Sequence, residues 1–237
     1  MHDATVFDRR ALLAGLGAVA VIGLPVRAFA AGLGGGLLDL LGRASDSSLD
    51  KLAQPGAFYN DPAIRISLPL IGKLGGLGAG GLGGTLLSAL DKGQKLGLTD
   101  NLVRKINDAA GLAAKEAKPV FRTAISKLSL NDVPDIATKR DGATQYLRTS
   151  AGDELKGKLR PLIDSGLSQV GAFRQVDRLA ARSSLFRSAG ITRDGLGNSV
   201  TDQALNGIFS YIGGEEGRLR DNPVGAVGGL LKGLLGN

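Results

Sequence analysis

The chain has 237 residues, a formal net charge of +7 and an aromatic content of only 4%. It contains no cysteine, and His2 is its single histidine. The chain after His2 therefore contains neither cysteine nor histidine. It cannot form disulfides, Cys/His zinc sites, iron–sulfur clusters or nucleophiles activated by a Cys-His or Ser-His-Asp system. The length is enough for one sizeable core, which must consist mainly of leucine, alanine, valine and isoleucine.

The first 30 residues have the pattern of a secretory signal peptide. Arg9 and Arg10 precede an uncharged apolar run, residues 11–26, and Ala28-Phe29-Ala30 then supplies a small-residue cleavage site. The paired arginines favour the twin-arginine route, and the run is shorter than the ~20 apolar residues of a membrane span. We predict export by the twin-arginine translocase, cleavage after Ala30 by signal peptidase and a periplasmic mature protein. An uncleaved membrane anchor is the alternative.

The beginning of the mature chain predicts helices followed by an extended segment. Residues 31–48 form a glycine- and leucine-rich segment in which a short amphipathic helix is expected. A second, polar helix should run from Ser45 to Gln54, because Pro55 cannot continue the hydrogen-bond ladder. Residues 63–68 alternate apolar and polar side chains, a strand periodicity that Pro69 interrupts. We expect an extended segment that lies on a helical core.

Two glycine- and leucine-rich tracts are of low complexity, residues 72–84 and residues 224–236. The first contains a formal G-x-G-x-x-G pattern at Gly76, Gly78 and Gly81, which dinucleotide-binding folds place between a strand and a helix. No second strand with an acidic end follows, and a tract this rich in glycine produces the pattern by chance. We interpret it as a flexible insertion.

From residue 99 onward, apolar side chains recur with helical spacing. Ser150, with Asp153 three residues later, resembles a capping box, and Ser199 is a further candidate cap. Pro119 is expected to begin a new helix, and Pro161 to bend or restart another. The apolar stripes that define the predicted helices span residues 102–117, 120–128, 142–149, 150–170, 176–186 and 199–212.

About seven to eight short helices with short connections predict an all-α fold, an irregular helical globule with one extended segment near residues 63–68. We expect three parts along the chain. They are the signal peptide at residues 1–30, the glycine- and leucine-rich segment at residues 31–48 and a single helical domain at residues 49–237.

Several strings stand in a distinctive order along the chain, at residues 54–60, 64–69, 143–147, 204–209 and 215–223. Together they resemble a bacterial family, the domain of unknown function 4197 family, from about Leu49 to the C-terminus. The resemblance implies an exported, mostly helical protein with no assigned activity. It gives motif weight to Phe58, Tyr59, Asn60, Asn107, Thr144, Tyr146, Glu215, Glu216, Arg218 and Arg220.

These motif residues leave several roles open, since each of them can anchor a loop, cap a helix or form a buried hydrogen bond. Glu215 and Glu216 are adjacent carboxylates, the residue type that a hydrolase or lyase without histidine would use as general acid and base. Neighbours on a helix point about 100° apart, so we expect pairing with Arg218 and Arg220 instead. Tyr146, if buried, must find a hydrogen-bond partner.

We therefore predict a non-enzymatic binding or envelope-associated protein without a cofactor, which acts on a protein or lipid partner. Binding of lipid or a membrane surface is the alternative, favoured by the glycine- and leucine-rich tracts and the positive charge. A carboxylate-based hydrolase or lyase is a second alternative. Nucleic acid is not an expected partner of an exported protein, and the basic residues mostly alternate with acidic ones on helix faces.

Overall fold

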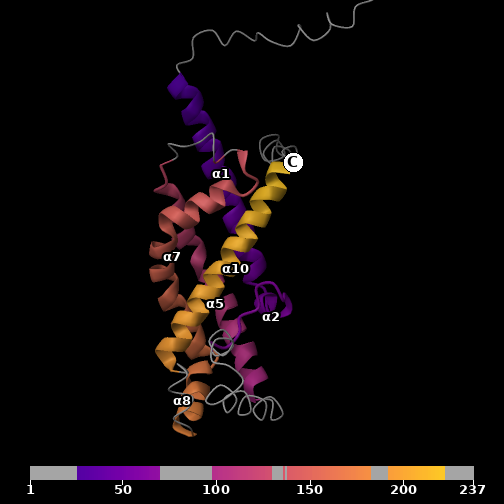
Figure 1. Cartoon of the computed structure of the whole chain (residues 1–237), viewed down its shortest axis with the longest axis vertical. Coiled ribbons are helices and arrows are strands. Elements are labelled where there is room, and N and C mark those ends of the chain that lie inside the picture. The colour runs from indigo at the N-terminus through magenta and orange to yellow at the C-terminus, as the bar shows by residue number, and fades with distance from the viewer. Residues whose placement is uncertain (1–25, 70–97, 130–135, 137, 183–191, 222–237) are drawn as a thin grey trace, which may run out of the picture.

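A computed structural model describes residues 26–69, 98–129, 136, 138–182 and 192–221. These residues form six helices and no strand (Figure 1). The helices are α1 (Val26–Leu52), α2 (Ala57–Asn60), α5 (Leu98–Ser126), α7 (Gly142–Gln169), α8 (Ala172–Arg182) and α10 (Arg193–Asp221). The predicted all-α fold is confirmed.

The helices are longer than the sequence predicts, since α1, α5, α7 and α10 each have 27 to 29 residues. α5 continues through Pro119 and α7 through Pro161, where breaks were expected. A proline removes one backbone hydrogen bond, whereas Phe121 and Ala124 continue the buried face of α5 beyond Pro119. The hydroxyl of Thr123 also donates to the carbonyl of Pro119 at 2.8 Å. Packing therefore preserves one helix across each proline.

Two predicted helix starts are wrong, because Ser150 and Ser199 lie inside α7 and α10. The first turn of α10 has a different cap, since the hydroxyl of Thr192 accepts the N–H of Gly195 at 3.0 Å. A cap contributes only about 1 kcal/mol. A capping signal alone does not divide a helix whose residues are buried on both sides of it.

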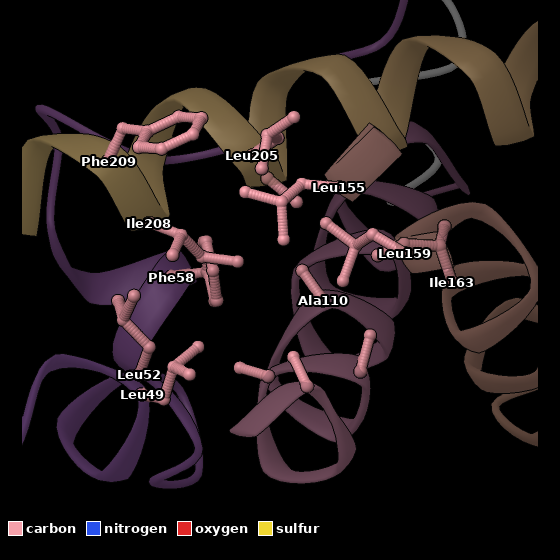
Figure 2. Packing of buried hydrophobic residues seen from close by; sticks show 14 of the residues in the cluster. Leu49, Leu52, Phe58, Ala110, Leu155, Leu159, Ile163, Leu205, Ile208 and Phe209 are labelled. Carbon is pink, nitrogen blue, oxygen red and sulfur yellow. The ribbon is translucent and has the colours of Figure 1, made fainter. Parts of the chain in front are cut away.

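The four long helices pack alongside one another around an aliphatic core (Figures 1 and 2). Figure 2 shows Leu155 and Leu159 of α7 beside α5, the helix that carries Ala110. The buried face of α5 is rich in alanine, and small side chains let the helices approach closely. A Cβ atom at Gly166 of α7 would lie only 2.7 Å from the carbonyl oxygen of Ala109.

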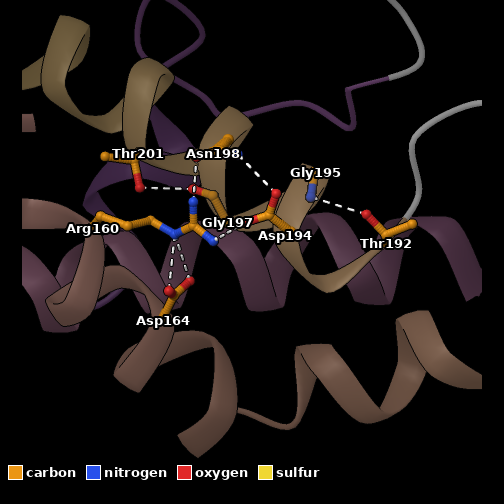
Figure 3. A network of polar contacts seen from close by, with 8 residues as sticks. All are labelled: Arg160, Asp164, Thr192, Asp194, Gly195, Gly197, Asn198 and Thr201. Atoms are coloured by element: carbon orange, nitrogen blue, oxygen red, sulfur yellow. Dashed lines mark hydrogen bonds and ion pairs between the residues drawn. The ribbon is translucent and has the colours of Figure 1, made fainter. Parts of the chain in front are cut away.

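A polar network joins the second half of α7 to the first turns of α10 (Figure 3). The guanidinium of Arg160 donates to both oxygens of Asp164, at 3.0 and 2.9 Å, and to Asp194 at 2.9 Å. Asn198 also accepts a hydrogen bond from Arg160. Gly197 leaves the necessary space, because a Cβ atom there would lie 2.5 Å from Asp164 Oδ1. The network fixes how α10 begins against α7.

Several sequence predictions concern residues outside the described part of the chain, namely residues 1–25, the tract at 72–84 and the tract at 224–236. The helix α1 begins at Val26, so its first turns include Ala28-Phe29-Ala30, and it continues past residue 48 to Leu52. Among the described helices, none is both long and apolar enough to cross a lipid bilayer.

Candidate functional site

An open cleft of about 590 Å³ lies between the beginning of α7 and the second half of α10. One face of each helix supplies its walls, which combine charged, hydroxyl and amide groups with a larger apolar part. The lining residues are Arg140, Asp141, Thr144, Gln145 and Arg148 on the α7 side, and Phe209, Ser210, Gly213 and Gly214 on α10.

Helical spacing explains this lining. Residues three or four apart lie on one face of a helix, so Thr144 and Arg148 are neighbours on α7, and Ser210 and Gly214 are neighbours on α10. Gly213 and Gly214 are consecutive residues of α10 that add no side chain to the cleft. No atom lies within 4 Å of the place that a Cβ atom of Gly214 would take. Gly214 therefore helps to keep this part of the cleft open.

A buried carboxylate holds the α7 wall from behind. Glu216 of α10 is fully buried, and it accepts the backbone N–H groups of Ala143 at 3.0 Å and Thr144 at 2.8 Å. The hydroxyl of Thr144 also donates to it at 2.6 Å. Asp141, at the N-cap position of α7, forms no side-chain capping bond. Glu216, a residue of α10, therefore caps the N-terminus of α7. A negative charge is favourable at the N-terminus of a helix.

The charge of Glu216 is balanced by Arg220, one turn further along α10. The guanidinium of Arg220 donates to Glu216 Oε1 at 2.9 and 2.6 Å. It also donates to the carbonyl of Ile136, at 3.3 Å. A buried carboxylate is costly unless it is paired and hydrogen-bonded, and these contacts meet that requirement.

The neighbouring Glu215 has different partners. Its carboxylate accepts hydrogen bonds from Arg218 at 2.6 Å, Lys51 at 2.7 Å and Ser47 at 3.0 Å. These donors, Arg218 first, lower the pKa of Glu215 to about 2 although burial opposes the change. The expected pairing of Glu215 with Arg218 and of Glu216 with Arg220 is confirmed. The two carboxylates point to α1 and α7 respectively and form no common site.

Arg148 presents a positive charge to the cleft. Its guanidinium lies 4.9 Å above the centroid of the Phe209 ring, and its Nη2 donates to the side-chain oxygen of Asn206 at 2.8 Å. Both contacts are with α10, so they hold the end of this flexible side chain in one place. Within the described part of the chain, no carboxylate pairs with Arg148.

The second arginine of the cleft, Arg140, differs in this respect. It forms an ion pair with Asp221 at 2.7 Å. Its side chain lies against Gly217, where a Cβ atom would be 2.7 Å from Arg140 Nε. Asp141 adds a negative charge to the wall and accepts a hydrogen bond from Gln145 at 2.8 Å. Among the described residues, Arg148 is therefore the cationic side chain of the cleft that has no carboxylate partner.

The described residues include no cluster of three or more acidic or histidine side chains arranged to hold a metal ion. The cleft offers two guanidinium groups, hydroxyl groups, one amide and the carboxylate of Asp141, so its side-chain charges sum to a net positive charge. This set of groups suits the recognition of oxygen-rich anions.

A family description named "Protein of unknown function (DUF4197)" matches residues 30–236 of the chain. The chain belongs to this family. No curated protein and no solved structure matches it. The match therefore confirms the family that the sequence motifs indicate and supplies no activity for it.

Asn107 and Gln203 together hold the extended segment. Gln203 is not among the motif residues predicted from the sequence. The side chain of Asn107 accepts the N–H of Ile66 and donates to its carbonyl, both at 2.9 Å. The side chain of Gln203, on α10, accepts the N–H of Ser67 and donates to the carbonyl of Ser67, both at 3.0 Å. These two amides supply the backbone hydrogen bonds that a neighbouring strand would supply. The segment lies on the helical core as expected, but it is shorter than the predicted residues 63–68, because Ile64 belongs to a turn in which its N–H donates to the carbonyl of Asp61 at 3.2 Å.

The string around Phe58 anchors the short helix α2. Phe58 is buried in the core, and the N–H of Asn60 donates to the carbonyl of Gly56 at 2.8 Å. The hydroxyl of Tyr59 donates to Asp100 of α5 at 2.9 Å. The Tyr59 ring also lies 4.2 Å from the guanidinium of Arg104. This group lies away from the cleft and joins α2 to α5.

Tyr146 is half-buried, and its hydroxyl donates to the backbone carbonyl of Ser129 at 2.6 Å. It does not line the cleft, although its neighbour Gln145 does. Of the predicted motif residues, only Thr144 both lines the cleft and contacts Glu216. Sequence reasoning missed Arg148. Its spacing of four residues from Thr144 is the signal that could have identified it, because that spacing places both on one helix face.

Proposed function

We propose that the protein is an exported, non-enzymatic binding module that takes its ligand or partner in the cleft between α7 and α10. The main support for the proposal is that three of the sequence strings typical of the family lie next to one another at this cleft. Residues 143–147 and 204–209 contribute to the two walls. The third string, residues 215–223, holds the α7 wall from behind through Glu216.

The first part of the proposal, export, rests on the N-terminal sequence. Paired arginines, an uncharged apolar run and a small-residue site precede Ala31. The family match begins at residue 30, next to the predicted cleavage position. Both observations favour a mature protein that starts at Ala31 in the periplasm.

The second part, binding without catalysis, rests on the state of the two adjacent carboxylates. A carboxylate hydrolase needs two carboxyl groups that face one another across room for substrate. Here Glu216 is fully buried and hydrogen-bonded to Thr144 and Arg220, and Glu215 faces α1. The geometry therefore favours a binding role over a carboxylate-based hydrolase or lyase.

Binding of lipid or a membrane surface is the weaker candidate. The glycine- and leucine-rich tracts at 72–84 and 224–236, which motivate it, lie outside the described residues. The cleft itself is open and lined by Arg140, Arg148 and Gln145, whereas a lipid-carrying cavity would be closed and apolar. A small ligand or a protein segment with polar groups suits these walls better.

Native mass spectrometry of protein isolated from the periplasm without detergent tests both parts. We expect a chain that starts at Ala31 and carries additional bound mass. Replacing Arg9 and Arg10 by lysine should abolish its appearance in the periplasm. The variant Gly214→Leu adds a side chain to the cleft wall and should lose the bound mass.

Gly157→Leu is the matched control, because Gly157 is an exposed glycine of α7 with no atom within 4 Å of its Cβ position. It should keep the bound mass. The proposal is wrong if the periplasmic chain carries nothing, or if Gly214→Leu retains the same bound mass as Gly157→Leu. Cytoplasmic retention of the wild type would contradict export.

A further inference from the structure

We infer that the cleft binds the anionic group of a small ligand, a carboxylate or a phosphate, and that Arg148 is its principal recognition residue. This inference rests on the proposed function and specifies its ligand class. It is carried by a cavity of suitable size and by a positive charge that the described structure fixes in place and leaves without a counter-ion.

The fixed position of Arg148 is the first step. A free arginine side chain loses about 2 kcal/mol of rotamer freedom when a ligand orders it. Here Asn206 accepts one hydrogen bond from Nη2, at 2.8 Å, and the Phe209 ring lies 4.9 Å from the guanidinium carbon. Both contacts are made by residues of α10. Most of the ordering cost is therefore met before binding, which raises affinity.

The second step is the number of donors that remain. A guanidinium has five N–H groups in a planar fork, and Asn206 uses one of them. A carboxylate or phosphate can accept two parallel hydrogen bonds from such a fork, and charge-assisted bonds of this kind are about twice as strong as neutral ones. Arg148 is thus arranged for a planar or tetrahedral oxyanion.

Arg148 differs from the other charged residues of the cleft, Arg140 and Asp141, in its partners. Arg140 is paired with Asp221, and Asp141 is a negative charge that the amide of Gln145 contacts. An anion near Arg140 would compete with Asp221 for the guanidinium, whereas no described carboxylate forms an ion pair with Arg148. We therefore place the anionic group at Arg148, with the exposed hydroxyl of Ser210 on the opposite wall.

The size of the cavity sets the ligand class. A volume of about 590 Å³ lies within the ~300–1,000 Å³ that small-molecule sites occupy. At Gly214 the wall offers backbone with no atom within 4 Å of the Cβ position, so a ligand can lie against it closely. The ligand is a small organic anion with its charged end at Arg148 and the remainder along this wall.

Nuclear magnetic resonance of ¹⁵N-labelled protein purified from the periplasm tests the inference. The probes are inorganic phosphate and succinate, each added at constant ionic strength with chloride as the reference anion. We expect saturable shifts of the amides of Thr144, Gly213 and Gly214 and of the Arg148 Nε–H. Arg148→Gln should weaken binding of the active probe by at least about tenfold, the loss of one strong charge-assisted contact.

Two matched variants keep the test decisive. Arg178→Gln removes an exposed arginine of α8 and the same net charge, so it should bind within about twofold of the wild type. Gly214→Leu retains both arginines and blocks the wall, so it should bind neither probe. A response to phosphate alone or to succinate alone identifies the source of the anionic group, and both outcomes support the inference.

Equal weakening by Arg148→Gln and Arg178→Gln would overturn the inference, because it would reduce the effect to net charge. Shifts spread over the surface of α8 as well as the cleft would overturn it too. If Gly214→Leu loses the native bound mass while Arg148→Gln keeps it, the binding module stands and the anion assignment fails. If neither variant affects any bound species, both proposals fail.

Discussion

Glu216 and Thr144, which are 72 residues apart in the chain, share two hydrogen bonds behind the cleft. The carboxylate accepts the backbone N–H of Thr144 at 2.8 Å and its hydroxyl at 2.6 Å. Because Thr144 also lines the cleft, a fully buried carboxylate holds the beginning of α7 in the position that shapes the proposed binding surface.

Removal of this carboxylate should destabilise the protein strongly. Glu216→Ala leaves Arg220 without its partner and the first N–H groups of α7 without an acceptor. Breaking a buried pair in this way costs about 3–5 kcal/mol, measured as the free energy of unfolding in urea. The matched variant Glu154→Ala removes an exposed partner of Lys127 and should leave the unfolding midpoint nearly unchanged. Similar losses in the two variants would contradict the capping role.

Glu215 should make stability depend on pH in acid. Hydrogen bonds from Arg218 above all, and also from Lys51 and Ser47, lower its pKa from 4.5 to about 2. The unfolded chain therefore takes up the proton first, so the stabilisation is complete above about pH 4.5 and is lost as the pH falls towards 2. The difference in unfolding free energy between the wild type and Glu215→Gln should shrink across this interval.

Urea unfolding at a series of pH values measures this difference. Glu116→Gln, at an exposed position of α5, is the control and should differ little from the wild type at any pH. A difference for Glu215→Gln that stays constant down to about pH 2 would show that the contacts of Glu215 do not depend on its charge.

Two glycines of α7 should respond in opposite directions to alanine. A Cβ atom at Gly166 would lie 2.7 Å from the backbone oxygen of Ala109, whereas one at Gly157 meets no atom within 4 Å. Gly166→Ala forces α5 and α7 apart and should cost about 1–3 kcal/mol. Gly157→Ala should stabilise the helix by about 0.5–1 kcal/mol. Thermal or urea unfolding measures the stability of each variant. Equal effects of Gly166→Ala and Gly157→Ala would rule out the close approach of α5 and α7 at Gly166.

Tyr211 should ionise only at a pH well above the ordinary range of a tyrosine. Burial, and then the hydrogen bond and charge of Asp61, raise its pKa from 10.0 to about 12. Its hydroxyl donates to Asp61 at 2.7 Å. An ultraviolet titration of the phenolate band should show one tyrosine with a pKa about two pH units above 10. Asp61→Asn should lower that pKa part of the way, because burial remains. An unchanged titration would contradict the role of Asp61.

The class of fold could be predicted from apolar spacing, and the division into helices could not. Local signals at Pro119 and Ser150 mark breaks that do not occur. Each signal is worth at most a few kcal/mol. Burial of Ala117 and Phe121 around Pro119, and of Leu147 and Leu155 around Ser150, outweighs it. Long-range packing decided these points, and packing is not visible in a window of sequence.

The candidate site was predictable only as a set of motif residues. The pairing of Glu215 and Glu216 with arginines on the same helix follows from their spacing, and it is confirmed. The contact of Glu216 with Thr144 joins two helices that are distant in sequence, so no local pattern reveals it. Arg148 belongs to none of the motif strings, and its role depends on Phe209, a residue of another helix.

The cleft between α7 and α10 is the proposed place of ligand binding. A photo-cross-linking amino acid placed at Ser210, an exposed residue of the cleft, tests it in the periplasm of living cells. Irradiation should yield an adduct, detected by its mass, that Arg148→Gln diminishes and that the same cross-linker at exposed Gly157 does not form. Equal adducts from the two positions, or none at Ser210, would contradict the claim.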